Sequence, residues 1–359
     1  MKIKTMLAKR LQMFAAAVVL CAFSGSAYAD YNLRFSELGP PRGPRADAMM
    51  WWADEIQKRT NSEVKIEFFW SQSLTKGKDN LRAVGTGIAD IGTIMGIYNP
   101  AEVLVWNYGS LPFVSDDVWV TVRTWQELQR TMPELNNEIT SQNVHILTNY
   151  ITGPSDLLTT FPVNTVDDLQ GKKIRATGSY MNLLTNVGAI PVNLGYGEAY
   201  QALDRGTVDG VAGYTYAIKA YKLHEVGSNV AEVNMGLVST WGAGINLDLW
   251  NSMPEDLRKV ITEVSDEFID RMAEAIINDI QNAREELETG IDGKSLKFTT
   301  LSPEERNKWK AASGEFVADW RKRVTDKGLD PQKIIDQVNV AEAKYTKELA
   351  EKGYPWTRN

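Results

Sequence analysis

The sequence of 359 residues predicts an α/β protein built from two lobes. The stretch 171–213 reads as strand, helix, strand, helix, strand, which is typical of a parallel α/β unit. The segment 32–94 repeats a similar β-α-β-α-β pattern. The length favours two domains, and an apolar content of 43% excludes a mainly disordered chain.

The first 29 residues are predicted to be a secretory signal peptide. A start with four Lys or Arg residues is followed by the apolar run 13–23 and by Ala27-Tyr28-Ala29, which is typical of a cleavage site. The apolar run is too short to span a membrane. The single cysteine, Cys21, lies inside this peptide, so we expect a mature chain without disulfides.

Charge excludes several classes of partner. Loss of the four basic residues of the signal peptide would change the net charge from −7 to −11 (−7 minus 4). An acidic exported chain is a poor candidate for binding nucleic acid or an anionic membrane. We therefore expect no nucleic-acid partner.

The elements of the first half follow from hydrophobic periodicity. The segment 98–113 is rich in aromatic residues and bears prolines. We predict strands at 32–36, 64–70, 88–94, 144–150 and 157–160, and helices at 46–58, 79–85 and 119–132.

The stretch 171–213 carries the most informative cation of the chain. Arg175 lies near the carboxyl end of its predicted strand, where open α/β sheets place their ligands. It is either an anion clamp or a surface residue at a strand end.

Two helix-to-strand corners resemble each other along the sequence. The segment 81–92 and the segment 202–210 both end a helix at glycine and then place an acidic residue before a strand. This repetition indicates two α/β lobes of related design. We interpret Asp90 and Asp209 as residues that cap loops.

The C-terminal third is predicted to be helical. A long helix is expected from 254 to 288, with Ser252 as its cap. Ser302-Pro303-Glu304-Glu305 is a strong start signal for a helix that we extend to about 324, and a last helix is expected at 331–349. These helices are interpreted as braces for both lobes.

The residues required for most catalytic chemistries are missing. The only histidines, His145 and His224, lie far apart without acidic or cysteine neighbours at ligand spacing, so no metal site is predicted. No nucleophile elbow and no phosphate-binding glycine motif is present. We predict no enzyme and no cofactor. Eleven tryptophans and thirteen tyrosines could instead wall a small-molecule pocket around an arginine.

Three segments resemble a known family, and they follow one another along the chain in the same order as in that family. Asp167 to Arg175, Gly188 to Val192 and Glu198 to Gly210 are similar to the solute-binding proteins (DctP type) of tripartite ATP-independent periplasmic (TRAP) transporters. Leu81 to Asp90 and Trp250 to Pro254 support the resemblance.

The resemblance implies a two-lobed periplasmic binding protein fold with hinge strands and a long bracing helix. It places lobe I at 30–150, with part of 240–300 returning to it, lobe II at 151–240, and C-terminal bracing helices at 250–359. Hinge segments are expected near 148–155 and 237–241. It also implies a periplasmic location after cleavage near Ala29, delivery to a TRAP membrane permease, and binding of the ligand's carboxylate by Arg175.

The sequence departs from the family pattern at three sites. Ser155 stands where many members carry a second arginine, Gly213 near a frequent asparagine, and Met95 at a frequent glutamate. Because a second carboxylate buried without a partner costs several kcal/mol, we predict a small organic acid with one carboxylate and an aromatic or weakly polar body. The predicted ligand-binding residues are Arg175, Tyr98, Tyr150, Ser155, Met95, Gly96, Gly213, Tyr214, Tyr216 and Trp241.

Two other functions stay open at this point. The same fold could serve as a ligand-sensing partner of a membrane receptor, or as a secreted enzyme such as a lyase. The sequence does not separate transport from sensing. We expect a monomer.

Overall fold

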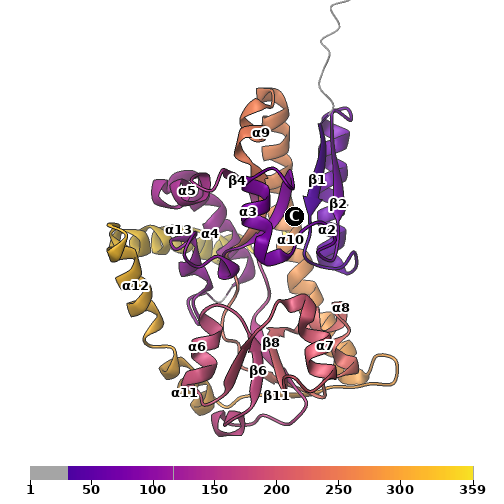
Figure 1. Cartoon of the computed structure of the whole chain (residues 1–359), viewed down its shortest axis with the longest axis vertical. Coiled ribbons are helices and arrows are strands. Elements are labelled where there is room, and N and C mark those ends of the chain that lie inside the picture. Colours follow the sequence, from indigo (N-terminus) through magenta and orange to yellow (C-terminus); the bar gives the residue numbers. More distant parts are fainter. Residues whose placement is uncertain (1–30, 116, 359) are drawn as a thin grey trace, which may run out of the picture. The chain divides into compact units, whose positions relative to one another are not determined.

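The protein is described by a computed structural model that covers residues 31–115 and 117–358 (Figure 1). The predicted signal peptide at 1–29 lies outside these residues. Asn32–Asn359 forms one compact unit. Within the described part of the chain, none of the helices combines the length and apolar character needed to cross a membrane.

Five strands form the sheet of the first lobe. Their order is β2-β1-β3-β10-β4. β1 and β3 run parallel, whereas β10 runs antiparallel to both β3 and β4. The strands are β1 (Tyr31–Ser36), β2 (Val64–Phe69), β3 (Ile91–Met95), β4 (Val144–Tyr150) and β10 (Trp241–Asn246).

Six strands form the sheet of the second lobe, in the order β11-β9-β5-β8-β6-β7. β6 is parallel to β7 and β8, as predicted for 171–213, but β5 is antiparallel to β8 and β9. The sheet is therefore mixed. The strands are β5 (Ser155–Thr159), β6 (Lys173–Ala176), β7 (Ile190–Asn193), β8 (Gly210–Tyr214), β9 (Asn229–Glu232) and β11 (Lys297–Thr300).

Helices connect and cover these strands. Three of them were not predicted: α5 (Pro133–Thr140), α8 (Thr215–Ala220) and α9 (Leu247–Ser252). The short amphipathic pattern of α5 follows the predicted helix at 119–132 directly. The helices are α2 (Pro44–Arg59), α3 (Asn80–Gly85), α4 (Val118–Thr131), α5 (Pro133–Thr140), α6 (Ser179–Asn186), α7 (Ala199–Asp204), α8 (Thr215–Ala220), α9 (Leu247–Ser252), α10 (Glu255–Thr289), α11 (Pro303–Ala312), α12 (Phe316–Asp326) and α13 (Pro331–Lys352).

Two predicted helix boundaries are wrong. Ser252 ends α9, where its hydroxyl donates to the carbonyl of Leu249, and the residue before α10 is Pro254. The helix expected from 302 to 324 is interrupted at 313–315 and forms α11 and α12. Ser313-Gly314 favours this break, because both residues are weaker helix formers than the residues around them.

The two similar corners have the same hydrogen bonds. Asp90 accepts from the backbone N–H of Arg34 at 2.8 Å, and its own N–H donates to the Arg34 carbonyl. Asp209 makes the same pair of bonds with Lys173, at 2.8 and 2.7 Å. Each carboxylate thus ties its strand to a neighbouring strand. Both residues therefore have a structural role, but they join neighbouring strands and do not cap loops as interpreted from the sequence.

The chain passes between the two sheets three times: the long helix α10 lies on the way from β10 to β11, and the other two connections are short adjacent segments. The first joins β4 to β5 through 151–154, and the second joins β9 to β10 through 233–240. They pair with each other, because Pro154 bridges to Leu237 and the Val238 N–H donates to Thr152 Oγ1 at 3.0 Å. The segments expected to be hinges, 148–155 and 237–241, overlap these two connections. Motion at these segments and the predicted lobe boundaries remain predictions.

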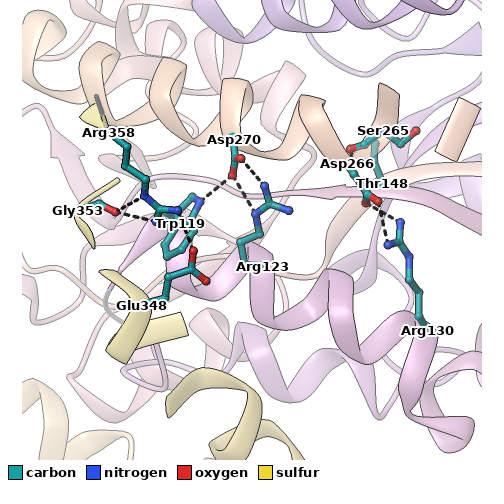
Figure 2. A network of polar contacts seen from close by, with 10 residues as sticks. All are labelled: Trp119, Arg123, Arg130, Thr148, Ser265, Asp266, Asp270, Glu348, Gly353 and Arg358. Carbon is teal, nitrogen blue, oxygen red and sulfur yellow. Dashed lines mark hydrogen bonds and ion pairs between the residues drawn. The ribbon is translucent and has the colours of Figure 1, made fainter. Parts of the chain in front are cut away.

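The helix α10 contacts elements of both lobes, packing on α2, α4 and β4 and also on α8 (Figure 1). Its side toward α4 carries two carboxylates one turn apart (Figure 2). Asp270 accepts hydrogen bonds from Trp119 Nε1 at 2.7 Å and Arg123 Nε at 2.9 Å, and Asp266 pairs with Arg130. Polar contacts therefore fix α4 against the long helix.

Candidate functional site

A cavity lies where the ends of strands from both sheets meet. Met95 at the end of β3 and Trp241 at the start of β10 contribute from the first sheet. Arg175 in β6 and Tyr214 at the end of β8 contribute from the second. The cavity therefore lies at the carboxyl end of β3 in the first sheet and at the carboxyl ends of the parallel strands β6 and β8 in the second. Such strand ends are the usual place for a ligand in α/β proteins.

Six of the ten predicted site residues line this cavity. They are Arg175, Tyr98, Met95, Tyr214, Tyr216 and Trp241. The other four, Tyr150, Ser155, Gly96 and Gly213, are not among its lining residues.

Two of these four lie behind the first-lobe wall. Tyr150 is 1% exposed, with its ring 5.0 Å from that of Trp241 and its hydroxyl bonded to Thr93 Oγ1 at 2.7 Å. Gly96 donates its N–H to the Thr240 carbonyl at 2.7 Å, and a Cβ there would clash with the Thr240 side chain. Both residues support the wall.

Ser155 and Gly213 lie in the second sheet. Ser155 pairs with Tyr214 across β5 and β8, and its N–H donates to the Gly236 carbonyl at 2.9 Å. A Cβ on Gly213 would lie 2.5 Å from the hydroxyl oxygen of Tyr196, a cavity residue. Gly213 therefore makes room for that ring.

The environment of Arg175 is unusual for a charged side chain. It is 4% exposed, and it donates from Nε to the Leu194 carbonyl at 2.8 Å and from Nη1 to the Ala212 carbonyl at 3.2 Å. In the described part of the chain it has no ion-pair partner. A buried cation without a counter-charge is costly by several kcal/mol, so the cavity is electrostatically suited to an anion.

Tyrosines form most of the cavity wall. The rings of Tyr196, Tyr214 and Tyr216 follow one another with centroids 5.9 Å apart and interplanar angles of 21° and 13°. Tyr221 meets Tyr196 edge-on at 4.9 Å. Burial raises the pKa of all four hydroxyls above the usual value of tyrosine. The rings stay neutral, exclude water and keep their hydroxyls as donors.

A second buried arginine was missed by sequence reasoning. Arg45, in the first turn of α2, lines the cavity at 8% exposure and pairs through Nη1 with Glu37 Oε1 at 2.9 Å. Burial opposes its charge, but Glu37 and nearby tyrosines hold the pKa of Arg45 above its usual value. No local signal singles out Arg45, because its partner lies eight residues away on another element.

Among the other lining residues that were missed, four have charged or aromatic side chains: Arg42, Tyr196, Tyr221 and Asp279. Tyr196 lies three residues beyond the end of β7, so the strand-end rule applied to Arg175 could have found it. Asp279, on α10, is half-buried, and burial raises its pKa to about 6, with Glu286 and Asp47 adding to the rise.

Within the described ranges, no group of three or more His, Cys, Asp or Glu side chains is arranged to hold a metal ion. His145 stacks on Trp250 at 4.9 Å, and burial lowers its pKa to about 4. His224 is 3% exposed. Neither histidine lines the cavity.

The fold and the cavity define a two-lobed α/β protein with a cavity lined by residues of both lobes. Residues 35–323 match the family described as "Bacterial extracellular solute-binding protein, family 7" (DctP). The chain belongs to this family, whose members are solute-binding receptors.

Relatives and solved structures agree with this assignment. The C4-dicarboxylate-binding periplasmic protein DctP of Rhodobacter capsulatus is 25% identical over 85% of this chain and 91% of its own length. A TRAP solute-binding protein of an unidentified marine microbe, in complex with pyroglutamate, has a TM-score of 0.78 at 21% identity, covering 87% of this chain and 99% of that one. One from Rhodoferax ferrireducens, in complex with benzoate, has a TM-score of 0.75 at 21% identity, covering 88% and 98%. The two structures show a shared fold.

Proposed function

We propose that this protein is a periplasmic solute receptor that binds a small organic acid through Arg175 and delivers it to a TRAP membrane permease for uptake driven by an ion gradient. One observation carries the proposal. Arg175 is a buried cation without an acidic partner among the described residues, and it lines a cavity walled by aromatic rings. A planar guanidinium can hold a carboxylate through parallel hydrogen bonds.

The ligand is proposed to carry one carboxylate. Three arginines line the cavity, but Arg45 is paired with Glu37, and Arg42 is exposed and donates to the Ala220 carbonyl. Only Arg175 is therefore both buried and uncompensated among these three. A second carboxylate would enter without a buried counter-charge that is free to pair with it, which is unfavourable.

The body of the ligand is proposed to be aromatic or weakly polar. Five tyrosines and Trp241 contribute rings to the wall, and rings of this kind gain most from covering apolar or flat surfaces. The benzoate and pyroglutamate named for two structural neighbours are ring compounds with a single carboxylate. R. capsulatus DctP, by contrast, is named for C4-dicarboxylates.

Binding is proposed to couple to closure of the lobes. Arg175 belongs to the second sheet and Trp241 to the first, so a ligand touching both favours the closed arrangement by its differential affinity for that state. We propose no catalytic role. Asp279 is the only carboxylate that lines the cavity in the described chain, and no histidine or cysteine joins it. The receptor is proposed to act as a monomer.

A thermal-shift screen followed by titration calorimetry tests the proposal. The screen compares monocarboxylates, dicarboxylates, sulfonates and aromatic acids on the purified protein. Binding of a monocarboxylate, at least about thirtyfold weaker in Arg175→Ala, is expected, because truncating a buried charge partner costs about 2–5 kcal/mol. Arg130→Ala, which removes an exposed ion pair far from the cavity, is the control and should leave affinity unchanged. Strong binding of succinate or malate without any monocarboxylate would contradict the ligand class.

A further inference from the structure

The first-lobe wall of the cavity contains a buried guanidinium that protein contacts hold in one position. Arg45 Nη1 donates to Glu37 Oε1 at 2.9 Å and contacts Met49 Sδ at 2.9 Å. The Arg45 Cζ atom also lies 5.8 Å from the ring centroid of Trp241, another wall residue.

Glu37 is itself fixed by a network behind the cavity. It is fully buried, and Oε1 also accepts from the Gly39 N–H at 2.7 Å. Its second oxygen accepts from Thr93 Oγ1, which in turn bonds to the Tyr150 hydroxyl at 2.7 Å. Tyr150 therefore acts on the cavity indirectly. Glu37 cannot turn away from Arg45 without breaking several buried hydrogen bonds.

The other terminal nitrogen of Arg45 lacks a partner. Nη2 is buried, and no described residue accepts a hydrogen bond from it. Unpaired buried donors are rare in folded proteins and call for an explanation. Nη2 lies beside Gly39, where an added Cβ would come within 2.1 Å of it, and the Gly39 backbone gives it no acceptor. Because the Arg45 side chain also lines the cavity, a group brought by the ligand is the remaining source of an acceptor.

We infer that Arg45 is a second anchoring point that donates a hydrogen bond to a neutral acceptor of the ligand, such as a carbonyl or ring oxygen. The inference rests on the proposed function, since it takes Arg175 as the carboxylate clamp. The Arg45–Glu37 pair carries no net charge, so Arg45 has no free positive charge to offer a second anionic group. A neutral oxygen needs no counter-charge and can accept the hydrogen bond alone. The ligand class becomes a monocarboxylate with a separate carbonyl-type oxygen.

Matched pairs of acids test this inference on the unmodified protein. Each pair differs by one carbonyl: pentanoate and 4-oxopentanoate, and cyclohexanecarboxylate and 4-oxocyclohexanecarboxylate. Glutarate is the dicarboxylate of comparable length. Calorimetry is expected to show the oxo acid of at least one pair binding about tenfold or more tightly than its partner, because a site built to hydrogen-bond an oxygen rejects the analogue without it. Equal affinity within both pairs, or tightest binding of glutarate, overturns the inference and leaves Arg175 as a carboxylate clamp. Failure of every acid to bind would instead refute the proposed function.

Two variants assign the preference to Arg45. Arg45→Lys keeps a cation for Glu37 but has no second guanidinium nitrogen, so the oxo-acid preference should fall to about twofold or less. Glu37→Gln retains the size of the side chain and removes its charge, so the affinity for glutarate relative to pentanoate should rise about tenfold. Arg34→Lys, which alters an arginine paired with Asp90 outside the cavity, is the control and should keep the wild-type ratios. An oxo-acid preference that survives in Arg45→Lys contradicts the assignment.

Discussion

The Cζ atom of Arg175 lies 5.0 Å from the ring centroid of Tyr196. The two side chains are 4% and 7% exposed, respectively. Tyr196 in turn occupies the space that a side chain at position 213 would need, since a Cβ there would lie 2.5 Å from the tyrosine oxygen. The position of the clamp therefore depends on a glycine that does not line the cavity.

Gly213→Ala is expected to weaken ligand binding by about fivefold, because the added methyl group displaces Tyr196 from the face of Arg175. A cation–π contact of this kind contributes on the order of 1 kcal/mol. Calorimetry with the acid found in the screen measures the effect. Combining Gly213→Ala with Tyr196→Phe removes the closest atom of the clash and should restore part of the affinity. An unchanged affinity in Gly213→Ala would show that Tyr196 does not position the clamp.

Arg42 links the lobes at the edge of the cavity. It lies between β1 and α2, and its Nε donates to the carbonyl of Ala220, the last residue of α8, at 2.6 Å. Arg42→Ala should raise the dissociation rate of the ligand about fivefold, since one hydrogen bond contributes about 1 kcal/mol, with little change in the association rate. Stopped-flow tryptophan fluorescence measures both rates. Arg82→Ala, another exposed arginine, should change neither, and equal rates for both variants and the wild type would exclude the link.

Asp156 makes stability depend on pH. It lies on β5 and accepts from the Asn234 N–H at 2.9 Å, and burial raises its pKa to about 7, with Glu232 adding to the rise. Because the folded-state pKa is above the unfolded value, the folded state binds more protons, and stability falls as pH rises from about 4 to about 7. Asp156→Asn should remove this loss, on the order of 2–4 kcal/mol.

Urea unfolding at pH 4 and pH 8 measures the effect of Asp156→Asn. The variant should be more stable than the wild type at pH 8 and similar to it at pH 4. Parallel pH profiles for the two proteins would mean that Asp156 does not titrate in this range. His145 acts in the opposite direction in both proteins, because burial lowers its pKa to about 4 and stability is then lost as pH falls from about 6.5.

The two carboxylates of α10 seen in Figure 2 form a matched pair. Asp270→Ala should cost about 1–3 kcal/mol, because the indole N–H of Trp119, a residue only 1% exposed, loses its acceptor. Asp266→Ala removes only its partly exposed pair with Arg130 and should cost less than about 1 kcal/mol. Chemical denaturation of both variants gives the difference. Equal costs would show that the Trp119 bond adds nothing.

Much of the fold could be predicted from local patterns. The strand at 144–150 was predicted with its observed bounds, and the pattern at 171–213 forms the parallel strands β6, β7 and β8. The errors arose where local signals compete. Because the apolar pattern continues past 312, the break between α11 and α12 was not predicted. Ser252, the last residue of α9, was assigned to the start of the next helix, α10.

The candidate site, like the fold, was predicted only in part. Arg175, Tyr98 and Tyr214 were predicted and line the cavity, since each lies at or just beyond the end of a predicted strand. Tyr150 and Ser155 are as close to such ends but face other parts of the structure. The sequence alone does not determine which of these neighbours point toward a common space.

The sequence by itself determined many of the strands and helices, the family and the one arginine whose position implied a ligand. These features follow from residues close together in the chain, through periodicity, capping and motif spacing. The tertiary structure alone decided that Arg45 is neutralised by Glu37 while Arg175 is not. That difference depends on which charges fold within hydrogen-bonding distance of each other, and burial makes it decisive, because an uncompensated charge is costly only where water is excluded.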